Sequence, residues 1–145
     1  MQDLPHHYRV AATAGPEGHV ALAAGKLDAI LSAPPLEFGG PSDRWSPETL
    51  LVAAVADCFI LTFRAIARAS KLSWVSLQCD VTGTLERRDG VTRFTEFTVR
   101  ASLGVPPDTG EARALRLLAK AEAGCLITNS LSGTTHLEAV VEVAS

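Results

Sequence analysis

Apolar and polar residues alternate along residues 75–86, and this period of two predicts a half-buried β-strand. Asp89-Gly90 supplies a tight turn, and residues 96–103 alternate in the same way, so the two segments predict a hairpin. Glu86 faces outward in this pattern. The core-facing residues of the first strand are Val75, Leu77, Cys79, Val81 and Leu85.

Alternation returns at the C-terminus, where Thr134–Val143 predicts a last strand with Val143 among its inward residues. The N-terminal third predicts three short strands, at residues 8–13, 19–24 and 26–32, separated by glycine-containing turns. Residues 33–45 follow as a loop, because their prolines and glycines exclude regular structure. A loop of this length in a small domain is often functional.

A long helix is predicted over residues 47–70. Ser46 suits the N-cap, Pro47 the first helical position, and Glu48 the positive end of the helix dipole. Residues 50–63 are apolar nearly all round, which predicts burial on several sides, between a sheet and a second subunit. This apolar stretch of 14 residues is too short to span a bilayer.

A second helix is predicted from about Thr109 to Gly124, with Leu115, Leu118 and Ala119 on its buried stripe. The order of elements is therefore strands, long helix, hairpin, helix and strand. Hairpins with helices packed on them indicate an α+β fold, and the length indicates one domain over residues 1–145.

Charge and composition exclude several function classes. The 13 basic residues scatter along a chain of net charge −3, which argues against a nucleic-acid surface. The N-terminus has neither a charged n-region nor an apolar h-region, so we expect a cytoplasmic protein with no membrane partner. No glycine-rich phosphate loop and no metal-binding spacing of histidines and cysteines is present, so we expect no cofactor and no metal.

The three cysteines are candidates for inert core residues, metal ligands or redox groups, because no secretion signal favours structural disulfides. Cys79 shares the parity of the inward residues, so we expect a buried, inert thiol. Cys58 lies about three turns into the long helix, beyond the reach of its dipole, and needs a cation from elsewhere to be reactive. Cys125 follows Gly124 at a helix end, where local mobility suits a thiol that approaches another sulfur, and a core role explains its position equally well.

Two segments together resemble the OsmC/Ohr family of osmotically inducible and organic hydroperoxide resistance proteins. Residues 46–59 resemble its first-cysteine helix, and residues 125–131 resemble its second-cysteine segment. The separation of 67 residues between the cysteines (125 − 58), the hairpin between them and the C-terminal strand agree as well. The resemblance covers most of the chain.

The resemblance implies an OsmC-like fold in which antiparallel sheets pack around a long buried helix in an intertwined homodimer. It implies a peroxidase for organic hydroperoxides, with Cys58 as peroxidatic and Cys125 as resolving cysteine. The reductant it implies is an external dithiol of the dihydrolipoamide type or a lipoylated protein. Glu48 matches the family glutamate that holds an active-site arginine, although it is also an ordinary acid of a helix N-terminus. Ten residues of helix, a rise of ~15 Å, separate it from Cys58, so the two can meet only if two such helices pack antiparallel across a two-fold axis.

The chain departs from the family at the catalytic arginine. Pro16 stands where one branch carries it, and Phe38 falls near its place in the other. Arg44, two residues before Ser46, is the nearest substitute and Arg9 a distant second. We expect Arg44 to lower the pKa of Cys58 and to position the peroxide.

Two other functions stay open. The dimer crevice can bind an apolar ligand, with the cysteines merely lining it, or the chain can be a redox-responsive stress protein without efficient turnover. The catalytic arginine discriminates between these two functions and a peroxidase. If no residue replaces it, Cys58 stays protonated and reacts slowly with peroxides.

Overall fold

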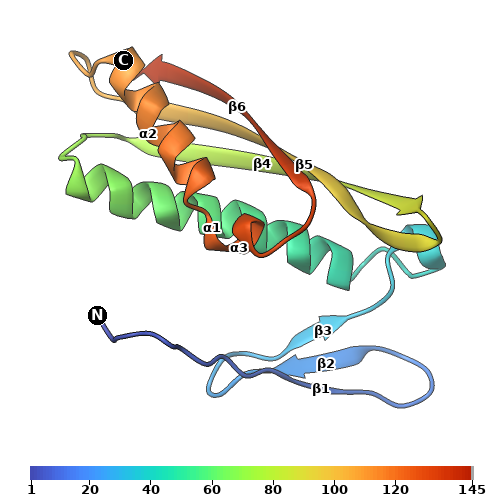
Figure 1. The fold of residues 1–145 in the computed structure, drawn as a ribbon. Helices are drawn as coiled ribbons and strands as arrows, with labels where there is room; N and C mark the ends of the chain where they lie inside the picture. Colours follow the sequence, from blue (N-terminus) through green and yellow to red (C-terminus); the bar gives the residue numbers. More distant parts are fainter. Residues whose placement is uncertain (145) are drawn as a thin grey trace. The chain divides into compact units, whose positions relative to one another are not determined.

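The computed structural model describes residues 1–144, and the chain divides into two compact units, Met1–Leu51 and the segment from Val52 onward. Figure 1 shows the elements of both units, and each unit is considered by itself. The long helix α1 (Pro47–Ala69) begins in the first unit and continues into the second. The expectation of a single domain over the whole chain stays a prediction.

The first unit holds a three-stranded antiparallel sheet. Its strands β1 (Ala11–Thr13), β2 (Val20–Ala23) and β3 (Ile30–Ser32) pair in sequence order. All three are shorter than the patterns predicted. The third begins only at Ile30, because Gly25 has a φ of 54° and the Leu27 amide donates to the Ala24 carbonyl over 3.0 Å, which turns the chain before it can extend.

The loop of residues 33–45 contains one turn of regular structure that the sequence did not predict. The 3₁₀ helix η1 (Leu36–Phe38) ends at Gly39, which has a φ of 84°. Gly40 then passes so close to the preceding chain that a Cβ there would lie 1.7 Å from the Pro34 carbonyl oxygen. The loop closes where the Ala33 amide donates to the Trp45 carbonyl over 2.9 Å.

The start of α1 confirms the predicted cap. The Thr49 amide donates to Ser46 Oγ over 3.1 Å, and the Ser46 amide donates to Thr49 Oγ1 over 2.8 Å. The two residues thus satisfy one another's backbone donors in the manner of a capping box. This reciprocal arrangement fixes the residue at which the helix begins.

The second unit is built on a sheet of order β4–β5–β6, formed by β4 (Ser76–Arg88), β5 (Val91–Val105) and β6 (Thr134–Val143). The hairpin β4–β5 is antiparallel, as predicted, but β6 pairs with β5 in parallel. The reason is the connection through α2 (Glu111–Ala123) and α3 (Leu126–Asn129), because a crossover helix returns the chain in its original direction. The mixed α+β class is confirmed, and this sheet is mixed where an antiparallel one was expected.

One face of this sheet forms the core. The buried stripe of α1 repeats every four residues, as Val55, Phe59, Phe63 and Ala67. The central strand β5 buries every second residue, namely Phe97, Val99, Ala101, Leu103 and Val105. The helix α2 contributes Ala114, Leu118 and Ala121, whereas Ala119, expected in its stripe, is exposed.

The helices α1 and α2 run antiparallel. The Arg113 guanidinium, near the start of α2, donates to the carbonyl of Ser70, just after α1. At the other end of α2, a Cβ on Gly124 would lie 3.8 Å from Cγ2 of Thr62 in the middle of α1. This arrangement brings the end of α2, and therefore Cys125, to the middle of α1.

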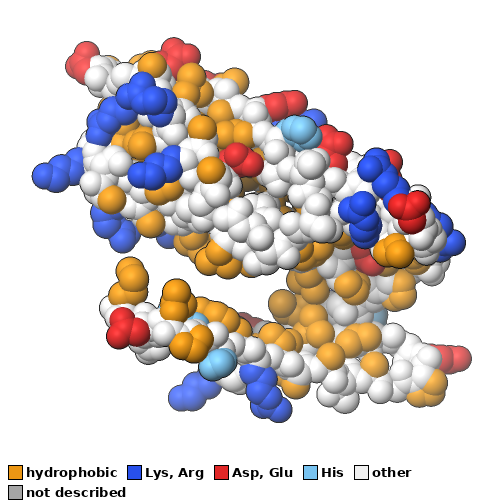
Figure 2. Space-filling view, in the orientation of Figure 1, with side chains coloured by type: hydrophobic (Ala, Val, Ile, Leu, Met, Phe, Trp, Pro, Cys, Tyr) orange, Lys and Arg blue, Asp and Glu red, His pale blue; other side chains and the backbone are white. Residues whose placement is uncertain are grey.

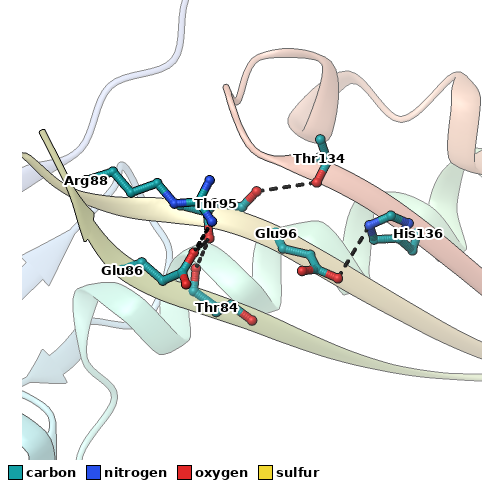
Figure 3. A network of polar contacts seen from close by, with 7 residues as sticks. All are labelled: Thr84, Glu86, Arg88, Thr95, Glu96, Thr134 and His136. Atoms are coloured by element: carbon teal, nitrogen blue, oxygen red, sulfur yellow. Dashed lines mark hydrogen bonds and ion pairs between the residues drawn. The ribbon is translucent and has the colours of Figure 1, made fainter.

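A β-bulge reverses the predicted parity at the far end of the hairpin. The register shifts between Thr84 and Leu85, opposite Thr95, so that Leu85 is 36% exposed and Glu86 points inward and is half-buried. Figure 3 shows the polar network that results, in which the Thr95 hydroxyl contacts the Glu86 carboxylate and Arg88 pairs with Glu86 at 2.9 Å. Val75 and Val143, expected inside, are exposed because they lie at strand ends.

Both units expose large apolar side chains (Figure 2). Only 22% of the most apolar 18-residue window of α1 is buried, and the predicted burial on several sides is not met within one chain. By length and composition alone, α1 is long and apolar enough to cross a membrane. The apolar stretch of residues 50–63, from which the sequence predicts no span, is too short for this. The length and composition of α1 are weak evidence for a span, because the core helix of a globular protein passes the same test.

Candidate active site

Cys58 lies beside the core stripe of α1, about 100° around the helix from Phe59. It is half-buried and lines an open pocket of about 470 Å³. The pocket is formed by α1 and the first residues of α3. Its lining residues are Ala54, Asp57, Cys58, Leu61, Thr62, Ala65, Leu126 and Ile127. Its walls are mainly apolar, which suits a hydrocarbon group beside a thiol.

Cys125 is the N-cap of the short helix α3 and is only 1% exposed. Its carbonyl accepts the Asn129 amide over 3.0 Å and the Thr128 hydroxyl over 3.1 Å. The Asn129 side-chain amide also donates to the Ala123 carbonyl over 3.2 Å, which ties α3 to the end of α2. The second cysteine segment is therefore a hydrogen-bonded turn, and the mobility expected of it stays a prediction.

The two thiols have opposite pKa shifts. The pKa of Cys58 lies below the ordinary value of 9.0. Burial raises this pKa, but four hydrogen bonds lower it by more. They come from the Ile127 amide, the Cys125 thiol, the Thr62 hydroxyl and the Leu126 amide. The pKa of Cys125 lies above its ordinary value. Burial and the neighbouring Cys58 raise it by more than the hydrogen bonds with Thr128 lower it. Cys58 thus loses its proton at a lower pH than Cys125 does.

Neutral groups account for the lowered pKa of Cys58, and the expected role of a cation in its reactivity stays a prediction. Within residues 1–144, the groups that lower its pKa are neutral hydrogen-bond donors, and none of the described residues that line the pocket is basic. Hydrogen bonds to the charged form favour ionisation as an opposite charge does. The sequence could have indicated Thr62, because it lies four residues after Cys58 and therefore on the same face of the helix. The sequence could not have indicated the α3 amides, because only the fold brings them to Cys58.

Cys79 is a free, half-buried thiol on the inward side of β4. Burial raises the pKa of Cys79 to about 11, and the nearby Asp80 carboxylate and Cys125 raise it in the same direction. It is therefore protonated at neutral pH and a poor nucleophile, which agrees with the inert role expected from its parity.

Glu48 lies in the first turn of α1 and belongs to the first unit. It is half-buried, and its Oε2 atom is buried without a hydrogen-bond partner among the described residues. A buried carboxylate oxygen without a donor costs free energy, so Glu48 is suited to accept from a cationic group.

Arg44 also belongs to the first unit, in the loop before α1. It is exposed and forms no ion pair within the part of the chain that the structure describes. With Trp45 and residues 29–31 it lines a separate open pocket of about 690 Å³. The structure thus brings together Cys58 and Cys125 in the second unit and places Glu48 and Arg44 in the first.

A family model described as "OsmC-like protein" matches residues 40–139, which include both cysteines, Glu48 and Arg44. The chain belongs to the OsmC-like protein family. It is 30% identical over 107 residues to the uncharacterized protein YmaD of Bacillus subtilis (strain 168), across 72% of this chain and 71% of YmaD. The family resemblance of the two cysteine segments is thereby confirmed.

Solved structures agree with this OsmC-like assignment. An OsmC-like protein of unknown function from Vibrio cholerae has a TM-score of 0.86 at 17% identity, over 94% of this chain and 100% of that one. A protein from Legionella pneumophila, described as the organic hydroperoxide resistance protein OsmC, has a TM-score of 0.75 at 25% identity, over 97% and 100%. The OsmC fold is therefore shared, and the low identities make this chain a divergent member.

Proposed function

We propose that this OsmC-like protein is a thiol-dependent peroxidase that reduces organic hydroperoxides through Cys58 and Cys125. The observation that carries the proposal is the pair itself: a thiol of lowered pKa beside one of raised pKa, at an apolar pocket. A peroxidatic thiol needs thiolate character and access, and a resolving thiol needs to be near. The Legionella and Elizabethkingia anophelis relatives described as organic hydroperoxide resistance proteins support the same reading.

The chemistry balances in three steps. The Cys58 thiolate attacks the distal oxygen of the peroxide, the O–O bond breaks, and the alkoxide leaves as an alcohol after it takes a proton. The sulfenic acid on Cys58 then condenses with the Cys125 thiol, which forms a disulfide and releases water. An external dithiol, of the dihydrolipoamide type or on a lipoylated protein, exchanges with this disulfide and restores both thiols.

Arg44 and Glu48 complete the proposal. Arg44 adds a cation that further lowers the pKa of Cys58 and orients the peroxide, and Glu48 holds that cation through its unpaired carboxylate oxygen. The active form is a homodimer, because two α1 helices packed antiparallel would place the Glu48 of one subunit near the Cys58 of the other. We place the reaction in the cytoplasm, where reduced dithiols are available.

Binding of an apolar ligand is the second candidate function. It is favoured by the mainly apolar lining of the Cys58 pocket and by the absence of a basic residue among its described lining. On this reading the cysteines only line the pocket, or they report oxidation slowly as part of a stress response.

One experiment separates the two functions. The fully reduced protein is mixed with a stoichiometric amount of cumene hydroperoxide, free thiols are counted over time, and disulfides are mapped by mass spectrometry. A peroxidase loses two thiols within seconds and shows a Cys58–Cys125 link with Cys79 still free. A folded protein that keeps all three thiols over many minutes is not a peroxidase, and ligand binding then takes its place.

A further inference from the structure

The Thr62 hydroxyl faces the sulfur of Cys58. Its Oγ1 lies 3.8 Å from Cys58 Sγ, a hydrogen-bonding distance for sulfur, and both side chains line the same pocket. The two residues are four apart on α1, so they lie one turn apart on the same helix face. The helix itself therefore brings the two side chains within reach of one another.

The orientation of this hydroxyl is unusual for a helix. A threonine in a helix generally bonds back to the carbonyl three or four residues earlier. Thr49 bonds to the Ser46 carbonyl and Thr128 to the Cys125 carbonyl in this way. The Thr62 hydroxyl instead contacts the side chain of the residue four before it.

The end of α2 explains why Thr62 keeps this orientation. A Cβ built on Gly124 would lie 3.8 Å from Cγ2 of Thr62, an ordinary packing distance, so the methyl group points at the last turn of α2. Threonine is branched at Cβ and stiff about χ1. With its methyl group against Gly124, its hydroxyl is directed to the sulfur.

We propose that Thr62 is a positioning residue for Cys58: its hydroxyl donates to the thiolate, stabilises it and holds its sulfur towards the pocket. The role in ionisation stands on the geometry alone, and its effect on peroxide reduction rests on the proposed function. When Cys58 loses its proton to solvent, the hydroxyl hydrogen turns to the sulfur, and no other covalent change is needed. A threonine four residues after the reactive cysteine thus supplies part of what the missing in-register arginine would give.

Thr62→Val tests this, because valine keeps the shape and the methyl packing and removes only the hydroxyl. The rate of iodoacetamide alkylation of Cys58 is followed against pH by mass spectrometry of its peptide, so that the other thiols do not interfere. We expect the apparent pKa of Cys58 to rise by about one pH unit, which lowers alkylation about tenfold on the acid side of the profile. Thr62→Ser keeps the hydroxyl but loses the methyl group that directs it, so its pKa is expected to lie between those of the wild type and Thr62→Val.

Thr82→Val is the matched control, because Thr82 lies on the outward side of β4, where its hydroxyl accepts Arg100 at 3.2 Å. It should leave the profile unchanged. A Thr62→Val protein that melts like the wild type and keeps the wild-type pKa overturns the proposal. If the pKa moves as expected in a protein that cumene hydroperoxide does not oxidise, the positioning role stands and the peroxidase assignment fails.

Discussion

The thiol of Cys125 stabilises the thiolate of Cys58, and Cys58 in turn helps to keep Cys125 protonated. The pKa values of the two cysteines are therefore shifted in opposite directions, although the cysteines belong to one small site. A nucleophile attacks as a thiolate, and a sulfenic acid condenses with a second thiol to release water. The opposite pKa shifts support the proposal that Cys58 takes the first step and Cys125 the second.

This assignment predicts different products for the two serine variants. Cys58→Ser should lose fast oxidation by cumene hydroperoxide, a decrease of at least about a hundredfold, because no other thiol has a lowered pKa. Cys125→Ser should still react once, and its sulfenic acid should persist at Cys58 because the resolving thiol is gone. Dimedone labelling followed by mass spectrometry measures that intermediate.

Cys79→Ser provides the control for this experiment. Its thiol has a pKa of about 11 and is protonated at neutral pH, so the variant should keep the wild-type oxidation rate and form the Cys58–Cys125 disulfide. Dimedone adducts on Cys125 in place of Cys58 would reverse the roles of the two cysteines.

The pKa shifts also predict how alkylation depends on pH. The thiolate fraction rises as pH rises through a pKa, so Cys58 should react fully at a lower pH than Cys125, and Cys79 should react only near pH 11. Site-resolved alkylation between pH 5 and 11 measures the three profiles. Equal profiles for Cys58 and Cys125 would contradict the hydrogen bonds described for the pair.

The raised pKa of Cys79 has a consequence for stability. Below its ordinary pKa of 9.0 the thiol is protonated in the folded and unfolded chains alike. Between 9.0 and about 11 the unfolded chain loses this proton while the folded chain keeps it, so folding stability falls as pH rises. Thermal melting of the wild type should thus decline more steeply across this window than melting of Cys79→Ala, and parallel curves would show that Cys79 is not desolvated.

The sequence predicted the long helix and the strands of the second unit well because their signals are local. The cap at Ser46, the turn at Asp89-Gly90 and the alternation over Thr134–Val143 each act within a few residues, and the observed helix and strand bounds follow them closely. The direction of β6 and the inward turn of Glu86 were missed. Each depends on a partner far along the chain, namely the crossover through α2 and the bulge at Thr95.

The candidate site divides in the same way. Cys58 and Cys125 were found through the two segments that resemble the family, and the structure brings their thiols together. The donors that act on Cys58 were missed, because two of them are backbone amides of Leu126 and Ile127. A backbone amide leaves no mark in the sequence, and only the fold shows where it points.

Arg44→Ala should weaken the reaction without abolishing it. Neutral donors already lower the pKa of Cys58, so loss of the proposed cation should reduce the peroxide rate about a hundredfold to a thousandfold, the range for loss of one positioned donor. Glu48→Gln should have a smaller effect in the same direction, since the amide still fills the space. Stopped-flow oxidation with cumene hydroperoxide measures both, with Glu37→Gln, an exposed acid of the same loop, as control. Unchanged kinetics in Arg44→Ala would remove Arg44 from the mechanism.

Gly40→Ala should disrupt the loop that carries Arg44. A Cβ at this position would lie 1.7 Å from the Pro34 carbonyl oxygen, and backbone atoms cannot move aside as a flexible side chain does. We expect a loss of about 3 kcal/mol, as for severe overpacking, and faster proteolysis within residues 33–45. Gly39→Ala is the matched control: its φ of 84° is strained for alanine, but no atom lies within 4 Å of the added Cβ, so its loss should be only about 1 kcal/mol.

The exposed face of α1 predicts that the chain works as a homodimer. Leu61 is 51% exposed beside the Cys58 pocket, and the buried residues of the first unit are only Ser32, Ala33 and Ser46, too few for a core of its own. A second copy that covers these surfaces would hide enough apolar area for a stable complex.

Leu61→Asp tests the dimer, because a carboxylate in a closed interface is costly and the variant should dissociate at least about a hundredfold more readily. Light scattering coupled to gel filtration, over a range of protein concentrations, measures this change. Val91→Asp serves as control, since Val91 is 57% exposed beside the hairpin turn, away from the cysteine pocket. A wild-type monomer with full peroxidase activity would refute both the dimer and the role proposed for Glu48, because Glu48 can reach Cys58 only from a second chain.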